Sequence, residues 1–144
     1  MGYQIYGYVQ IKKAEGWVTA PVYTKNPYRV DNLEPVIIWH GSEVGRYLWQ
    51  KGTYVTQEEA KDFMKEMGYE EGDTLEPVRA ISLAYMKYIA LTFDPDHNDY
   101  DDGGDEDRIK PGVERMAKQV EAVVDFAEFY GNFDEIRFIF HESY

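Results

Sequence analysis

The densest group of chemically active side chains in this chain is an acidic run over Asp94–Asp107. It holds eight of the 27 Asp and Glu residues and no Lys or Arg. Without these 14 residues, 19 acidic residues would face 15 basic ones, and the net charge would be −4 instead of −12. A concentrated block of carboxylates can bind a cation or a basic protein, whereas dispersed charge mainly confers solubility. We therefore expect the acidic run to carry the main interaction of the chain.

A basic protein partner is the first interpretation of the acidic run. Its carboxylates can approach the charge density of duplex DNA, which presents about one phosphate charge per 1.7 Å of axis. Such a segment would imitate nucleic acid, dock in the basic groove of a nucleic-acid-processing enzyme and speed association. A tyrosine within it would add contact area. The candidate partner-binding residues of the run are Asp99, Tyr100, Asp101, Asp102, Asp105, Glu106 and Asp107.

Two other interpretations of the acidic run remain open. In one, the run is only a solvated loop, because Pro, Gly and dense like charge disfavour both helix and strand. In the other, it binds calcium weakly, with Asp94, Asp96 and Asn98 at positions 1, 3 and 5 of a helix-flanked loop. That pattern departs from an EF-hand twice, since Asp99 replaces the glycine of position 6 and Asp105 replaces the longer glutamate of position 12.

A second chemical pattern is the four-residue segment Trp39–Ser42 (WHGS), at the end of an apolar run. It resembles the His-Gly-Ser/Thr signature of ADP-ribosyltransferases, a family that uses NAD. The resemblance implies that His40 holds the ribose, that Tyr54 stacks on nicotinamide and that Glu135 is the catalytic acid. The same segment also suits a strand end, a glycine turn and a serine helix cap. An NAD-using enzyme is therefore the alternative to a binding protein.

Composition excludes several function classes. The chain has no cysteine, hence no disulfide and no thiolate metal site, and its three histidines lack the spacing of zinc ligands. A pI of about 4.6 argues against direct binding to nucleic acid or anionic lipid. No apolar run approaches the ~18–20 residues that span a bilayer. We expect a cytoplasmic protein without a cofactor and without membrane association.

The hydrophobic pattern predicts a single α+β domain over residues 1–144. Tyr3–Ile11 alternates as a half-buried strand, and a hairpin loop leads to a second strand at about Trp17–Tyr23. Val36–Trp39 is typical of a strand buried on both faces, which would lie at the centre of the sheet. The last strand, Glu135–His141, would turn toward the core Ile136, Phe138 and Phe140.

Helices are predicted between the third and the last strand. One is capped by Ser42, and a capping box over Thr56–Glu59 begins the next. Val78–Phe93 is apolar nearly all round and would be the most buried helix. After an acidic loop at about residues 94–110, Pro111 begins a long amphipathic helix. We expect a mostly antiparallel sheet of about four strands with helices packed on one face.

The other face of this sheet would then be exposed. Along the first strand it carries Tyr6 and Tyr8, which join the partner-binding candidates because tyrosine is common at protein interfaces. Together these features predict a small acidic interaction or inhibitor protein that binds a basic partner. Its size, acidity and lack of cysteine resemble those of immunity proteins paired with nuclease toxins and of phage inhibitors of host defence, a similarity of physical type.

Overall fold

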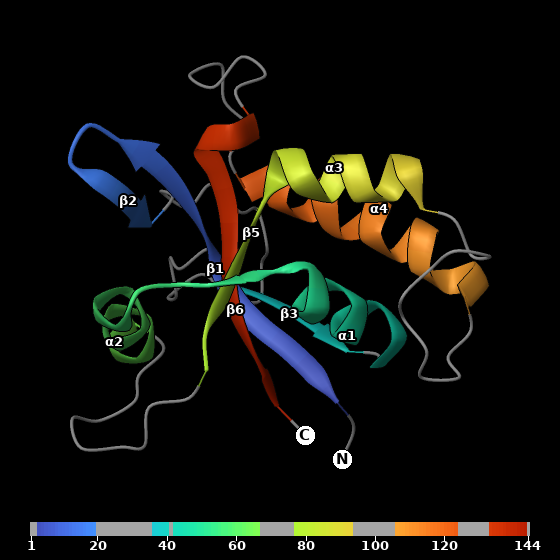
Figure 1. Ribbon diagram of the computed structural model, residues 1–144, viewed down its shortest axis with the longest axis horizontal. Coiled ribbons are helices and arrows are strands. Elements are labelled where there is room, and N and C mark those ends of the chain that lie inside the picture. The colour runs from blue at the N-terminus through green and yellow to red at the C-terminus, as the bar shows by residue number, and fades with distance from the viewer. Residues whose placement is uncertain are drawn as a thin grey trace, which may run out of the picture.

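The structure is a computed structural model that describes residues 3–19, 36–40, 42–66, 77–93, 106–123 and 133–143. An antiparallel sheet forms the middle of the fold, with helices on both of its faces (Figure 1). Its strands are β1 (Gln4–Lys13), β2 (Gly16–Thr19), β3 (Val36–His40), β4 (Thr53–Tyr54), β5 (Arg79–Ser82) and β6 (Ile136–Ser143). The helices are α1 (Ser42–Lys51), α2 (Gln57–Glu66), α3 (Leu83–Thr92) and α4 (Glu106–Val123), and the short 3-10 helix η3 (Phe133–Glu135) precedes β6.

The strand order is β2-β1-β6-β5-β4, and β3 pairs with β1 beside this path. One edge of β1 pairs with β6 along most of its length. The other edge is shared by two strands, because β3 pairs with Gln4–Tyr8 and β2 with Gln10–Lys13. A two-residue turn joins β1 to β2, and Gly16 after it adopts φ +120°, a conformation that favours glycine. The first and last described strands are therefore neighbours at the centre of the sheet.

The pairing of β1 with β6 is close at Gly7. A Cβ atom at this position would lie 1.9 Å from the carbonyl oxygen of Ile139 and 2.6 Å from the Cα of Phe140. Both contacts are with backbone atoms, which cannot move aside without disturbing the ladder. Gly7 is thus required by the approach of the two strands.

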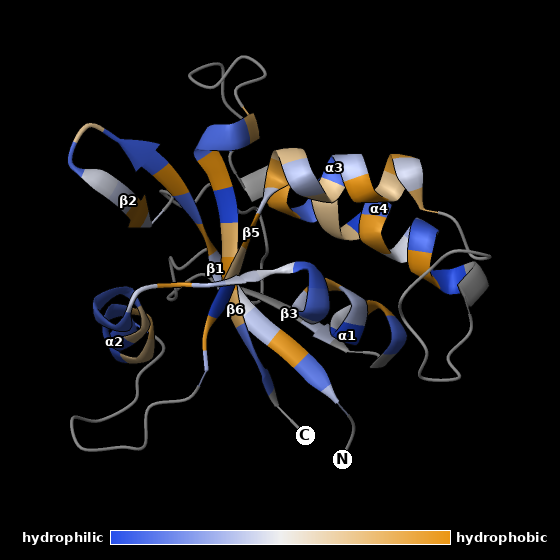
Figure 2. Ribbon diagram, viewed as in Figure 1, coloured by the Kyte–Doolittle hydropathy of each residue, from blue (hydrophilic) through white to orange (hydrophobic). Residues whose placement is uncertain are grey.

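Two apolar clusters lie on opposite faces of the sheet, and β6 contributes to both. Successive side chains of this strand point to opposite faces, and the apolar residues Phe138, Ile139 and Phe140 follow one another in its middle (Figure 2). Phe138 and Phe140 are fully buried in the larger cluster with residues of α1, α3 and α4. Ile139 points to the other face, where it packs with Tyr8 and with Phe63 of α2. Each face therefore has its own helical cover.

The α+β class and the antiparallel sheet are confirmed, as are several local predictions. The capping box is present: the Thr56 Oγ1 accepts a hydrogen bond from the Glu59 N–H at 3.1 Å, and the Thr56 N–H donates to Glu59 Oε1 at 3.2 Å. The predicted inward residues of the last strand, Ile136, Phe138 and Phe140, are buried. Apolar residues of α2 and of the amphipathic helix α4 are buried as well. They are Ala60, Phe63, Met64, Val113, Met116, Ala117 and Val120.

The predicted strand arrangement needs two corrections. The sheet has six strands instead of about four, because Thr53–Tyr54 and Arg79–Ser82 also pair. The prediction that Val36–Trp39 is the centre of the sheet is wrong. Within the described residues β3 pairs with β1 alone, so β1 and β6 take the central place.

Two helix predictions also need correction. The segment Val78–Phe93 is not one helix: β5 occupies its first part, and α3 begins only after Ser82, whose Oγ accepts a hydrogen bond from the Tyr85 N–H at 3.0 Å. An apolar run without clear period fits a buried strand and a buried helix equally well. The second correction is at Pro111, which lies inside α4, because this helix already begins at Glu106.

The prediction of an exposed second sheet face is wrong. α1, α3 and α4 pack on one face as expected, but α2 covers part of the opposite face. As a result Tyr8 and His141 are each only 3% exposed. Tyr6 is half-buried and lies against His141, with 3.9 Å between the ring centroids.

The first testable prediction concerns the β6 core. Phe138→Ala should lower the free energy of unfolding by about 3–5 kcal/mol, because it removes a fully buried ring that stacks on Phe140 at 4.9 Å. Leu91→Ala is the control, since Leu91 is 78% exposed and its removal should change stability by less than about 0.5 kcal/mol. Denaturant unfolding measures both, and equal stability of the two variants would contradict the assigned core.

Candidate functional site

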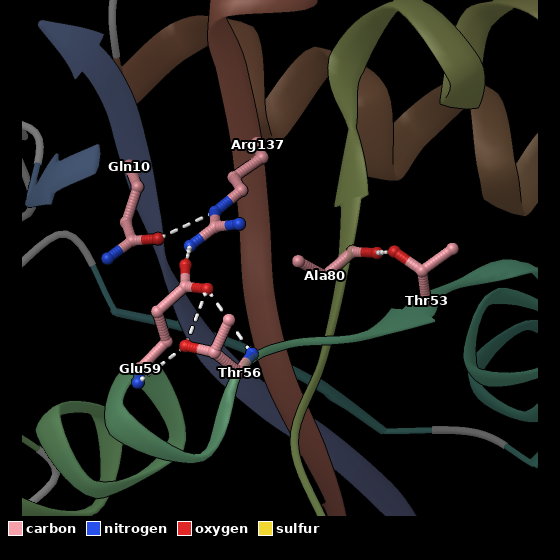
Figure 3. A network of polar contacts seen from close by, with 6 residues as sticks. All are labelled: Gln10, Thr53, Thr56, Glu59, Ala80 and Arg137. Atoms are coloured by element: carbon pink, nitrogen blue, oxygen red, sulfur yellow. Dashed lines mark hydrogen bonds and ion pairs between the residues drawn. The ribbon is translucent and has the colours of Figure 1, made fainter. Parts of the chain in front are cut away.

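Arg137 joins the sheet to α2 on the face opposite the larger core. Its Nε donates a hydrogen bond to the Gln10 Oε1 at 2.7 Å, and its Nη2 forms an ion pair with the Glu59 carboxylate (Figure 3). The Arg137 side chain is only 11% exposed. Glu59 also belongs to the capping box, so a single carboxylate closes the first turn of α2 and anchors it to β6. This network fixes the position of α2 over the sheet.

The environment of Glu59 keeps it ionised. Burial of the carboxyl raises its pKa, but the hydrogen bond and charge of Arg137, together with the Thr56 N–H, outweigh burial and hold the pKa below its usual range. The ion pair with Arg137 is therefore present throughout the neutral pH range.

A cleft of about 410 Å³ lies beside this network. Its walls come from the four strands β2, β4, β5 and β6 and from the ends of α1 and α3. The lining residues are Trp17, Lys51, Thr53, Ala80, Ile81, Ser82, Tyr85 and Arg137. Trp17 lies beside the Arg137 guanidinium, with 4.4 Å between the ring centroid and the Cζ atom, and the Lys12 Nζ is 5.9 Å from the same ring. The cleft thus combines aromatic walls with cationic groups.

The three residues of the enzyme alternative lie far apart. His40 ends β3 and Tyr54 lies in β4, so four strand spacings of about 4.8 Å separate them by roughly 19 Å. Glu135 ends η3 beside the opposite end of β1, about seven residues or roughly 23 Å from the register position of His40. The described register therefore does not assemble the site that the resemblance implies.

Tyr54 is held in place by Arg79. Its hydroxyl accepts a hydrogen bond from the Arg79 Nη2 at 2.9 Å, and the guanidinium lies 4.3 Å from its ring centroid. The same guanidinium lies 4.6 Å from the Trp49 ring centroid and donates to the Trp49 carbonyl oxygen. Arg79 thus joins the short β4–β5 pair to the end of α1.

The sequence did not predict the row of exposed apolar side chains on α3. Tyr85 is 39%, Tyr88 59% and Leu91 78% exposed, and each follows the previous one by three residues, which places them along one side of the helix. The two tyrosine rings stack with 6.2 Å between their centroids. The sequence predicted a helix buried all round, because its composition does not show which side faces the core. We call Tyr85, Tyr88 and Leu91 the α3 stripe.

The described part of the chain is electrically balanced. It carries 13 Asp or Glu and 13 Lys or Arg, so the whole net charge of −12 belongs to the other residues. Of the acidic run, only Glu106 and Asp107 belong to a described element, where they begin α4. The remaining candidates of the run lie outside the described residues. They are Asp94, Asp96, Asn98, Asp99, Tyr100, Asp101, Asp102 and Asp105.

Comparisons of the chain with protein-family models, curated proteins and solved structures found no match. In the described residues, no group of three or more His, Cys, Asp or Glu side chains could hold a metal ion. None of the helices in this part of the chain has the length and apolar content of a membrane span.

His141 predicts a pH dependence of stability. Burial lowers its pKa from 6.5 to about 4, because the ring lies between Tyr6 and Phe63 with little access to water. In the unfolded chain this histidine takes up its proton near pH 6.5, so the native state loses stability as the pH falls from about 6.5 to 4, by about 3 kcal/mol in total. Denaturant unfolding between pH 7 and pH 5 measures the loss.

The control for this measurement is His141→Phe, which keeps a ring in the pocket but removes the titrating group. Its stability should change less than that of the parent protein between pH 7 and pH 5, a window that lies above the ordinary pKa values of Asp and Glu. An identical slope in the two proteins would show that another group causes the pH dependence.

Proposed function

We propose that this chain is a protein-binding module whose partner is a basic protein, and that the acidic run together with the α3 stripe forms its binding surface. The observation that carries the proposal is the concentration of charge. The run that follows α3 holds eight of the 27 Asp and Glu residues and no Lys or Arg, and without it the net charge would be −4 instead of −12. Clustered carboxylates of this kind attract a basic surface over longer distances than a surface of balanced charge does.

The position of the α3 stripe supports the proposal. α3 and α4 lie side by side, and a salt bridge between Lys87 Nζ and Glu121 Oε2 at 3.2 Å joins them. The acidic run connects the end of α3 to the start of α4, and Leu91 precedes its first residue by only three positions. A partner held by the carboxylates would therefore also be near exposed tyrosine rings.

The two parts of this surface would contribute differently to binding. Carboxylates facing Lys and Arg act mainly on the association rate, and salt screens them. Exposed tyrosine and leucine side chains lose contact with water in the complex and slow dissociation. The basic groove of a nucleic-acid-processing enzyme already accepts a row of phosphates, so it offers the charge that a row of carboxylates requires. A nucleic-acid-processing enzyme is therefore the partner class that we propose.

Charge neutralisation tests the first part of the surface. The partner is captured from a host lysate at 0.1 M salt and identified, and association rates are then measured with the purified pair. Changing Asp99, Asp101, Asp102, Asp105 and Asp107 to Asn should slow association by at least about tenfold at low salt. The difference should vanish near 1 M salt, where the Debye length falls to about 3 Å.

The matched control removes five negative charges elsewhere. Glu15, Glu58, Glu66 and Glu114 are changed to Gln and Asp62 to Asn, all of them exposed positions among the described residues. If both variants slow association equally, overall charge and not the acidic run is responsible, and the proposed surface is wrong.

Tyr88→Ala tests the second part of the surface. Tyr88 is 59% exposed, so the substitution should leave the fold intact, but it should speed dissociation from the captured partner more than about fivefold. Tyr54→Ala is the control, since Tyr54 is 66% exposed and lies in β4, outside the α3 stripe. An equal effect of both variants would place the contact outside α3.

A further inference from the structure

The cleft beside Arg137 has a composition that the acidity of the chain does not suggest. Two of the residues that line it, Lys51 and Arg137, are cations, and none of the described lining residues is acidic. Glu59 neutralises Arg137 in part, but the Lys51 ammonium has no comparable ion pair among those that the structure describes; it lies 5.6 Å from the Tyr47 ring centroid. The cleft is therefore a local cationic site.

The Arg137 guanidinium keeps a nitrogen for a ligand. Two of its three nitrogens are used by Gln10 and Glu59. Figure 3 shows the third nitrogen turned away from Glu59 and toward β5, the strand of Ala80. Thr53 lies beyond Ala80 in the same direction. These two residues also line the cleft. An N–H donor with a positive charge thus faces the cleft from β6.

Further hydrogen-bond donors come from the start of α3. The Ser82 Oγ accepts the Tyr85 N–H, so its own hydroxyl hydrogen is available to an acceptor in the cleft. Tyr85 adds a phenolic hydroxyl to the same lining. Because Ser82 caps the first turn of α3, the helix dipole also favours negative charge near this end. Two cations and two hydroxyls together exceed what the two oxygens of a carboxylate need and suit the three oxygens of a phosphate ester.

The remaining walls are apolar and aromatic. Trp17, Ile81 and the Tyr85 ring line the cleft together with the cations. Its volume of about 410 Å³ lies in the range of about 300–1,000 Å³ in which proteins hold small ligands. We propose that this cleft binds a small molecule that joins a phosphate group to an aromatic ring, with a nucleoside monophosphate as the representative of the class. Lys51 and Arg137 hold the phosphate, and the ring lies along the apolar wall.

Calorimetric titration with AMP tests this site. The protein should bind AMP saturably, with the tryptophan fluorescence changing in parallel because Trp17 lines the cleft. Lys51→Gln should weaken binding by about tenfold because it removes one charged hydrogen bond. Lys51→Arg keeps the charge and should retain most of the affinity. Lys118→Gln, an exposed lysine of α4 away from the lining residues, is the matched control and should bind like the parent protein. Circular dichroism confirms that each variant is folded.

Four outcomes overturn the proposal. Absence of saturable AMP binding up to millimolar concentration would show that the cleft is not such a site. Equal losses in Lys51→Gln and Lys118→Gln show a general charge effect. If inorganic phosphate binds as tightly as AMP, the ring does not contribute to binding. If adenosine binds as tightly as AMP, the phosphate does not contribute. None of these outcomes depends on the basic protein partner.

Discussion

The rest of the structure depends on the pairing of β1 with β6. This ladder joins the first and the last described strands over eight register positions, from Gln4 with Ser143 to Ile11 with Ile136. Every other strand is attached to one of these two, directly or through β5. Because the partners are separated by most of the chain, the central contact is also the one with the largest loop-closure entropy. The close approach at Gly7 makes it dependent on one residue without a side chain.

Helices cover both faces of the β1–β6 pair, so some polar side chains of these strands have little access to water. On the face of α2, the same row of the sheet carries Gln10, Arg137 and Ser82, and the neighbouring row carries Tyr8 and Ile139. An arginine there would be costly alone, and Glu59 compensates it from the first turn of α2. The pair thus links helix capping to tertiary packing: the carboxylate that begins α2 also fixes its position. The cleft exists because α2 covers Tyr8 and Ile139 but leaves Trp17 and Ser82 accessible.

Sequence patterns predicted the elements that interactions between neighbouring residues determine. They failed for the strand and the buried residues that depend on segments far away in the sequence. The capping box at Thr56 and the helical stripe of α4 were readable because a turn of helix contains its own partners. β5 was missed because the four residues Arg79–Ser82 show no clear period, and only pairing with β6, more than 50 residues later, makes them a strand. Tyr8 was expected at the surface for the same reason: its cover, Phe63, stacks on it at 5.3 Å from a distant helix. The cleft was beyond prediction, since its lining comes from six separate elements.

The concentration of charge has a physical consequence for how such a chain can carry function. Without the acidic run the net charge would be −4 instead of −12, so much of the self-repulsion of the chain arises among the residues of one segment. Carboxylates gathered in the sequence between α3 and the first turn of α4 add attraction for a basic surface at little cost to the core, because a longer connection costs little further entropy once the helices it joins pack together. Stability and long-range attraction then reside in different residues. The cationic cleft at Arg137 and Lys51 follows the same logic on a smaller scale: it can differ in sign from the chain as a whole because screening limits surface charges to about 8–10 Å at ordinary salt.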